Sequence, residues 1–246
     1  MAQSLNNLAD LYQAQGQYAQ AEPLYRRALT IREKALGPDH SDVATNLNNL
    51  ALLYDAQGQY AQAEPLFRRA LDIREKALGS EYPDVAQSLH NLAGLYQAQG
   101  QYAQAEPLLK RVLTIREKAL GPNHPDVATS LNNLAGLYQA QGQYAQAEPL
   151  YKRALTITEK ATDPNYSVVA MILNNLGRLY DIQGQYAQAE PLFRRSLAIR
   201  EKVLGPNHPD VATSLENLAL LCRLTRRIAE AEKLEERAAK IKANNK

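Results

Sequence analysis

The chain has 246 residues, and its 28 basic side chains nearly balance its 26 acidic ones, which leaves a formal charge of only +2. Such a balance gives no net field that would draw the chain to nucleic acid or to an anionic membrane. No apolar run approaches the roughly 20 residues that span a bilayer, and the first residues lack the pattern of a secretory signal. We therefore expect a cytoplasmic protein with no membrane or nucleic-acid partner.

A short segment beginning at Gln15 returns at positions 57, 99, 141 and 183, each time 42 residues later and nearly unchanged. A fixed period of this size indicates one supersecondary unit stacked on its own copies, in which each copy buries its apolar side against its neighbours. We expect a single array rather than separate globular domains. Its six repeats are placed at about 1–37, 38–79, 80–121, 122–163, 164–205 and 206–246.

Each repeat carries two stretches of helical periodicity separated by a glycine. In the first repeat, Leu5, Leu8 and Tyr12 follow the helical period, Gly16 interrupts it, and the period resumes from Tyr18. This pattern predicts a helix, a tight turn and a longer second helix. First helices are expected at 2–16, 43–57, 84–99, 126–141, 168–183 and 210–225, and second helices at 18–36, 60–78, 102–120, 144–162, 186–204 and 227–243.

The loops between repeats carry a stop signal followed by a start signal. Gly37 and Pro38 end the second helix, and Asp39 with Asp42 is spaced much like a capping box for the next one. His40, His124 and His208 lie in alternate loops, too far apart along the array to share a metal ion, so loop packing or capping is the better interpretation.

Eight positions of the first repeat resemble the tetratricopeptide repeat, and they are Leu8, Ala9, Tyr12, Gly16, Tyr18, Ala21, Tyr25 and Ala28. The 42-residue period and the Gly-Pro-Asn-His-Pro-Asp-Val-Ala segment at 121–128 resemble kinesin light chain repeats. The resemblance covers the whole chain. It implies an all-α fold, an α-solenoid that forms a right-handed superhelix of six helix-turn-helix repeats, with the first helices lining the concave surface.

Catalytic and cofactor signatures are missing from the sequence. Cys222, the only cysteine, takes the place that tyrosine holds in the other repeats, which favours a buried structural thiol over a nucleophile. No phosphate-binding glycine loop, paired-histidine metal motif or Ser/His/Asp set is present. We expect a non-enzyme with no cofactor and no metal.

Two neighbouring positions on every first helix carry mostly asparagine, a poor residue for a helix interior. By the resemblance these side chains line the groove, where an amide pairs with the backbone of a bound peptide. Gly94 and Gly136 remove side chains in the middle repeats, and His90 and Arg178 flank them as cationic or titratable groups. The predicted groove residues are Asn7, Asn48, Asn49, His90, Asn91, Gly94, Asn132, Asn133, Gly136, Asn174, Asn175, Arg178 and Asn217.

Three alternatives to a peptide-binding scaffold stay open. In the first, the asparagines do no more than bridge neighbouring helices, or recur only because one repeat was recently duplicated. The array could be a spacer in a larger protein, with self-association end to end through its first repeat. Reading of RNA, one base per repeat, is disfavoured by the near-neutral charge. At the other end, Arg226 at the turn glycine position and Glu235 at an apolar position predict a solvated cap.

Overall fold

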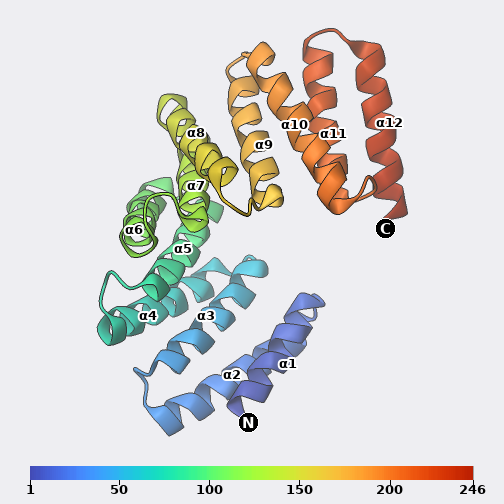
Figure 1. The fold of residues 1–246 in the computed structure, drawn as a ribbon. Helices are drawn as coiled ribbons and strands as arrows, with labels where there is room; N and C mark the ends of the chain where they lie inside the picture. The colour runs from blue at the N-terminus through green and yellow to red at the C-terminus, as the bar shows by residue number, and fades with distance from the viewer. Residues whose placement is uncertain (246) are drawn as a thin grey trace. The chain divides into compact units, whose positions relative to one another are not determined.

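The computed structural model describes residues 1–245, which fold into twelve α-helices joined by short turns and contain no β-strand. Figure 1 shows the helices arranged as successive antiparallel pairs, one pair per repeat. The chain divides into two compact units, Met1–Gly121 with three pairs and Pro122–Lys246 with three. The predicted all-α solenoid of six helix pairs is confirmed.

The helix bounds follow the predicted ones closely. The first helices are α1 (Ala2–Ala14), α3 (Ser41–Ala56), α5 (Pro83–Ala98), α7 (Pro125–Ala140), α9 (Tyr166–Ile182) and α11 (Pro209–Leu224). The second helices are α2 (Tyr18–Leu36), α4 (Tyr60–Leu78), α6 (Tyr102–Leu120), α8 (Tyr144–Lys160), α10 (Tyr186–Leu204) and α12 (Ile228–Asn244). Among residues 1–245, no helix has the length and apolar character needed to cross a membrane.

The turn inside each repeat needs a left-handed residue. Gly16 has φ of 71°, a conformation that a side chain disfavours, and Gln17 then donates its backbone N–H to Tyr12 O at 2.8 Å. In the last repeat Arg226 adopts φ of 62° at the same place, the one non-glycine residue with positive φ in the described chain. The turn therefore survives the loss of its glycine at some cost in backbone strain.

The predicted capping box between repeats is wrong in its capping residue. His40, not Asp39, caps α3, because its Nδ1 accepts the backbone N–H of Asp42 at 3.1 Å. His124 and His208 cap α7 and α11 in the same way. Imidazole nitrogen thus supplies the acceptor that a helix start needs, which is the capping role expected for these histidines.

One loop departs from the pattern. Asp163 stands where the other loops have a glycine with φ near 89°, as at Gly37, and a side chain is disfavoured there. The helix before it, α8, accordingly ends at Lys160, two residues short of the predicted end. Asn165 caps the next helix, and its side chain accepts the N–H of Val168 at 3.3 Å.

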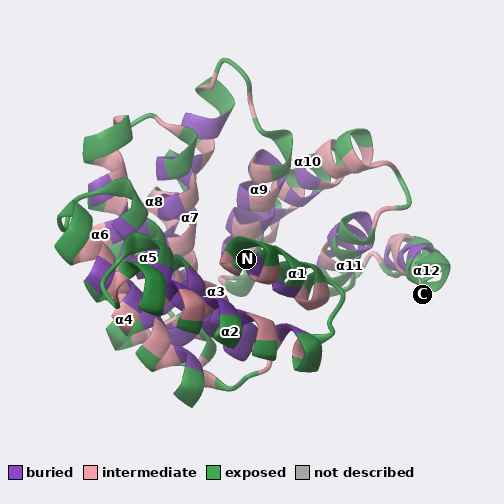
Figure 2. Cartoon of the chain, turned by 90° about the horizontal axis from the view of Figure 1, so that it is seen from below, coloured by how far each residue is buried: buried purple, intermediate pink, exposed green. Residues whose placement is uncertain are grey.

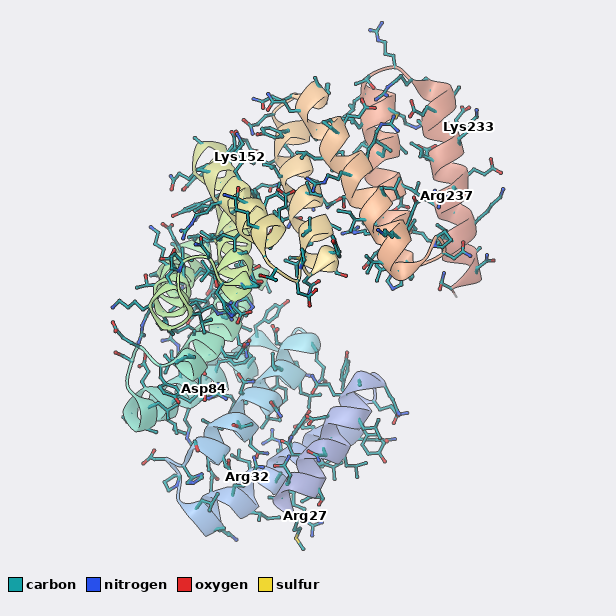
Figure 3. All side chains as sticks on the ribbon, viewed as in Figure 1. Arg27, Arg32, Asp84, Lys152, Lys233 and Arg237 are labelled. Atoms are coloured by element: carbon teal, nitrogen blue, oxygen red, sulfur yellow. The ribbon has the colours of Figure 1, made fainter. Side chains whose placement is uncertain are left out.

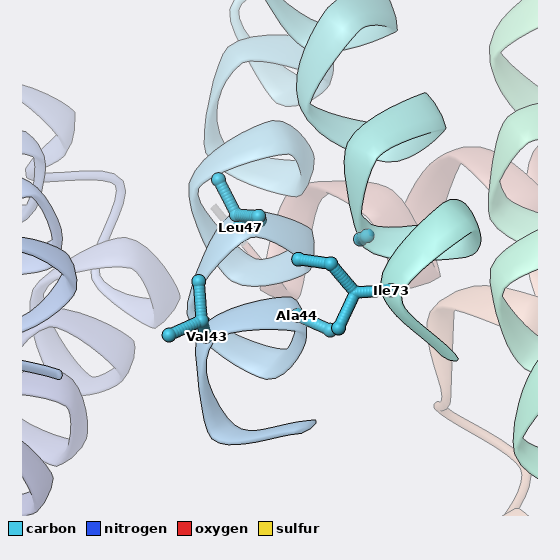
Figure 4. Packing of buried hydrophobic residues seen from close by; sticks show 5 residues of the cluster. Val43, Ala44, Leu47 and Ile73 are labelled. Carbon is cyan, nitrogen blue, oxygen red and sulfur yellow. The ribbon is translucent and has the colours of Figure 1, made fainter. Parts of the chain in front are cut away.

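The core includes small clusters of buried residues between the two helices of a repeat, as in the α3–α4, α5–α6 and α11–α12 pairs. Figure 4 shows Val43, Ala44 and Leu47 of α3 packed against Ile73 of α4. Leu29, which belongs to the preceding repeat, packs against this cluster from outside. A repeat therefore completes its core with a leucine from the repeat before it, as expected of a stacked array. Figure 2 shows buried residues along the helix sides that face other helices and exposed residues at the turns.

Candidate functional site

The predicted groove asparagines form hydrogen bonds from one repeat to the next in the first unit. Asn91 of α5 donates Nδ2–H to Asn48 Oδ1 of α3 at 2.7 Å, and its own Oδ1 accepts from Gln87 at 2.8 Å. Asn49 makes a longer contact of the same kind with Asn6 at 3.4 Å. Asn48 is buried and Asn91 is half-buried, so the second amide of each pair lies nearer to solvent.

The second unit repeats the arrangement with good geometry. Asn175 donates to Asn132 Oδ1 at 3.0 Å, and Asn217 donates to Asn174 Oδ1 at 2.8 Å. Asn132 and Asn174 are buried. The asparagine row is therefore an inter-repeat hydrogen-bond system, whatever else it binds. The half-buried amides use only part of their two donors and two acceptor lone pairs in these bonds.

The remaining predicted residues occupy different surroundings. Asn7 is exposed and accepts from Gln3 at 2.7 Å, and Asn133 is half-buried and accepts from Asn132 at 3.4 Å. Gly94 is exposed and a Cβ built there would meet nothing within 4 Å. The ring of His90 is half-buried in the first unit, where burial and then the Arg116 charge lower its pKa.

A cavity of about 330 Å³ in the second unit brings three predicted residues together. Gly136 of α7 and Asn175 and Arg178 of α9 line it, together with Tyr151 of α8. The Tyr151 hydroxyl donates to Gln139 at 3.0 Å, and burial raises the pKa of Tyr151 to about 12. A Cβ at position 136 would lie 3.6 Å from that hydroxyl, so the glycine keeps the cavity open above the ring.

Arg178 supplies the positive charge of this cavity. Its side chain is exposed, and among residues 1–245 it has neither a hydrogen bond nor an ion pair. Asp181, one turn along α9, has a pKa that burial raises and that the Arg178 charge lowers. The cavity thus combines a free guanidinium, amide groups from Gln139 and Asn175, and a buried phenol.

A second polar system, built around Tyr54 and its copies, joins the repeats and was not predicted from the sequence. The Tyr54 hydroxyl donates to Glu22 of the preceding repeat at 2.8 Å and accepts from Arg26 at 2.6 Å. The Tyr54 hydrogen bond, followed by Arg26, lowers the pKa of Glu22. The Glu22–Arg26 pair is therefore more than a solvated i,i+4 pair, because it holds the next repeat through a phenol.

The same cluster recurs at Glu64, Arg68 and Tyr96, and at Glu148, Lys152 and Tyr180. The signal in the sequence was the joint recurrence of a glutamate, a cation four residues later and a tyrosine 28 residues after that. Nothing in the local pattern joins the tyrosine to the pair, because the contact crosses from one repeat to the next.

Removing one phenol oxygen tests this joint. Tyr96→Phe is expected to lower the free energy of unfolding by about 1 kcal/mol, because Glu64 and Arg68 lose their shared partner while the ring still packs. Urea unfolding followed by circular dichroism measures the change. Tyr102→Phe is the matched control, since that hydroxyl has no hydrogen bond within residues 1–245. Equal stability of the two variants would contradict the role of the phenol.

In the last repeat an arginine makes the contact with glutamate that the tyrosine hydroxyl makes in other repeats. Cys222 stands at the tyrosine position and is buried, and burial raises the pKa of its thiol. Arg227, from the turn, instead donates to both carboxylate oxygens of Glu190 at 2.8 and 2.9 Å. Arg194 joins the same carboxylate and also reaches Glu230 at 2.6 Å. Cys222 is therefore a buried structural residue beside this ion-pair network.

Glu235 has a partner in its own repeat. Arg223 of α11 donates two hydrogen bonds to its carboxylate, both of 2.6 Å. In the first and fourth repeats the equivalent pair is a tyrosine hydroxyl on a glutamine, as with Tyr25 and Gln13 at 2.8 Å. In the last repeat the Arg223–Glu235 ion pair therefore replaces the hydrogen bond between tyrosine and glutamine.

Residues 1–245 contain no group of three or more histidine, cysteine, aspartate or glutamate side chains that could hold a metal ion. The polar features of these residues include amides, the unpaired guanidinium of Arg178 and inter-repeat ion pairs. These groups suit recognition of a polar chain by hydrogen bonds.

Comparison with known proteins identifies the repeats. A family model described as tetratricopeptide repeat matches residues 1–76, 84–160 and 168–244. The chain belongs to the tetratricopeptide repeat family. Tetratricopeptide arrays are protein-interaction scaffolds and in general carry no catalytic site of their own. A search of curated proteins gives no match.

Solved structures add relatives at moderate identity. A Podosopora anserina protein described as having kinesin light chain nearly identical TPR-like repeats is 34% identical, with a TM-score of 0.70, over 81% of this chain and 95% of that one. BtubC (BKLC) from P. vanneervenii is 27% identical, with a TM-score of 0.75, over 94% and 91%. A Rap protein complexed with Competence and Sporulation Factor shares the fold alone, at 18% identity and a TM-score of 0.65, over 98% and 74%.

Proposed function

We propose that this scaffold binds a peptide segment of a partner protein along the asparagine-bearing faces of its first helices. The observation that carries the proposal is the cavity beside Asn175, where Arg178 presents an unpaired guanidinium next to amides with unused hydrogen-bonding capacity. Side-chain amides form hydrogen bonds with the backbone of a peptide irrespective of the peptide's side chains. A single cation such as Arg178 then favours a peptide that carries an anionic group at one position.

The ligand that best fits the cavity is a peptide with an acidic side chain or a terminal carboxylate. A guanidinium donates two parallel hydrogen bonds to a carboxylate, which makes the contact stronger than a neutral one. The open space left by Gly136 admits the acidic group beside the Tyr151 ring. A Rap protein of the same fold has been solved in complex with Competence and Sporulation Factor, which supports the proposal.

Selection from a random peptide display library on the immobilised chain tests the proposal. We expect enrichment of acidic peptides whose affinity falls by about tenfold or more on Arg178→Ala, because a charge-assisted hydrogen bond contributes about 1.5–3 kcal/mol. Gly136→Leu should block the same peptides sterically while leaving Arg178 in place.

Arg195→Ala is the matched charge control, because that arginine lies on the second helix α10, where it pairs with Glu159 at 2.5 Å. Its removal should leave peptide affinity unchanged. Absence of any enrichment, or equal loss from both arginine variants, would contradict a groove site. The spacer alternative would then be preferred, since the asparagines already bridge repeats without a ligand.

A further inference from the structure

The arginine near the end of the second helix is held from two sides in the first repeat. Arg32, which Figure 3 labels on α2, donates from Nη1 to Asn46 Oδ1 and to the Asp42 backbone oxygen, both on α3. Its second terminal nitrogen, Nη2, donates to Gln3 Oε1 on α1. The first helix of the same repeat and the first helix of the next repeat therefore both supply acceptors to one guanidinium.

Arg200 of α10 stands at the corresponding position of the fifth repeat and keeps only one side of this arrangement. Its Nη1 donates to Ser214 Oγ at 2.8 Å and to the Asp210 backbone oxygen at 3.0 Å, both on α11. On the other side Met171 of α9 stands in place of Gln3, and a thioether sulfur is only a weak acceptor. Within residues 1–245 the Nη2 of Arg200 makes no hydrogen bond. A half-buried cation is therefore left with an unused donor.

A cavity of about 320 Å³, named here the Arg200 cavity, lies where this contact is missing. Met171, Arg200 and Leu204 line it, and the start of α9 contributes Asn165 and Ser167. The Asn165 side-chain oxygen caps α9, but its amide N–H groups and the Ser167 hydroxyl have no hydrogen bond in the part of the chain that the structure describes. The cavity thus combines three unused donor groups with an apolar wall.

One carboxylate also lines the Arg200 cavity. Burial lowers the pKa of Arg200, and the charge of Asp210 raises it. The Asp210 side chain is exposed, so solvent screens its repulsion of a bound anion. The Arg200 guanidinium and the Asn165 amide N–H groups can only donate, so a ligand must supply acceptor oxygens.

We propose that the Arg200 cavity binds a carboxylate carried on a short aliphatic chain. The ligand oxygens accept from Arg200 and Ser167, and the aliphatic chain packs on Met171 and Leu204. A hydrogen bond between charged groups is about twice as strong as a neutral one, which favours a carboxylate over an amide. The bound carboxylate takes the place that the Gln3 amide oxygen has in the first repeat, and so joins α9 to α10.

Titration of the full chain with sodium pentanoate, followed by the backbone amide NMR signals of residues 165–171, tests the proposal. We expect saturable shifts, and we expect pentanamide, which keeps the shape without the charge, to bind about fivefold more weakly or worse. N-acetylglutamic acid α-amide is the second carboxylate probe, because the same group comes either from a free acid or from a glutamate side chain of a protein. The tighter of the two probes identifies the source, and either order supports the site.

Met171→Gln supplies the missing contact from within the chain. The glutamine offers Arg200 the acceptor that Gln3 supplies in the first repeat. Pentanoate affinity should therefore fall by about tenfold or more, and the midpoint of thermal unfolding should rise by about 2–4 °C. Thr129→Gln is the matched control, because it lies at the same position of the fourth repeat, where Thr158 replaces the arginine. That variant should keep the affinity of the parent.

Two more substitutions check the charge and the place of the ligand. Asp210→Asn removes a repulsion and should tighten pentanoate binding by about threefold or more, without changing the binding of pentanamide. Arg178→Ala should leave pentanoate binding unchanged, because different residues line the two cavities.

Three results would overturn the proposal. Shifts that do not saturate, or full affinity in a folded Met171→Gln variant, would exclude the site. Pentanamide that binds as tightly as pentanoate, or affinity that does not respond to Asp210→Asn, would exclude an anionic ligand. Loss of pentanoate binding in Arg178→Ala would assign the carboxylate to the other cavity.

Discussion

Asn91→Ala is expected to lower the free energy of unfolding by about 1–3 kcal/mol, although Asn91 belongs to the proposed peptide site. Its Nδ2–H is the donor that satisfies Asn48 Oδ1, and Asn48 is buried with 8% of its surface exposed. Deleting the donor leaves a buried acceptor unpaired, which costs more than the hydrogen bond itself contributed. Urea unfolding of the two proteins measures the difference.

A paired variant distinguishes this structural effect from ligand binding. Asn48→Leu with Asn91→Ala removes the acceptor together with the donor, so most of the lost stability should return. If Asn91 also contacts a peptide, the paired variant stays defective in binding while Asn48→Leu alone binds normally. The triple variant Asn91→Ala, Asn133→Ala, Asn175→Ala should abolish capture of the peptide. Binding by the stable paired variant at the affinity of the parent would assign the asparagines to stability alone.

The repeat period and helix signals were sufficient to predict the fold. The apolar period between Leu5 and Tyr12, the break at Gly16 and the stop at Gly37 each act within one repeat, so the sequence shows them directly. The end of α8 was misplaced because Asp163 changes the backbone available to the loop, and the period alone does not reveal that change. The capping box was assigned to Asp39 because aspartate is a commoner capping residue, although loop packing or capping was expected of the histidine beside it.

The site was harder to predict because its contacts cross repeats. Asn91 meets Asn48 at a sequence separation of 43, and Tyr54 meets Glu22 at a separation of 32. A repeated residue looks the same in the sequence whether it faces a ligand or the next copy of itself. Gly136 and Arg178 stand at one repeat position whose residue varies along the chain, and the structure brings these two together in one cavity.

Arginines at one position of the second helices show the same dependence on a neighbouring repeat. Arg32 of α2 is 7% exposed and donates to Asn46 Oδ1, which is fully buried, and to the backbone oxygen of Asp42 at 3.1 Å. Arg200 makes the same contacts with Ser214 at 2.8 Å and with the Asp210 backbone at 3.0 Å. Between the fourth and fifth repeats, Thr158 stands at the position that corresponds to Arg32. Ile172 stands at the position that corresponds to Asn46.

Arg32→Ala is accordingly expected to destabilise the chain by about 3 kcal/mol, because hydrogen bonds from a charged donor are lost and the buried Asn46 Oδ1 is left without a donor. Arg32→Thr with Asn46→Ile copies the combination of Thr158 and Ile172 into this joint. Thr158 donates its hydroxyl to Leu155 O of its own helix at 2.9 Å, so the threonine hydroxyl is not left unpaired, and Asn6 Oδ1, which loses Asn46, still accepts from Asn49 at 3.4 Å. The double variant should therefore recover to within about 1 kcal/mol of the parent. A double variant as unstable as Arg32→Ala would show that the arginine contributes through its own packing, and that the two kinds of joint are not interchangeable.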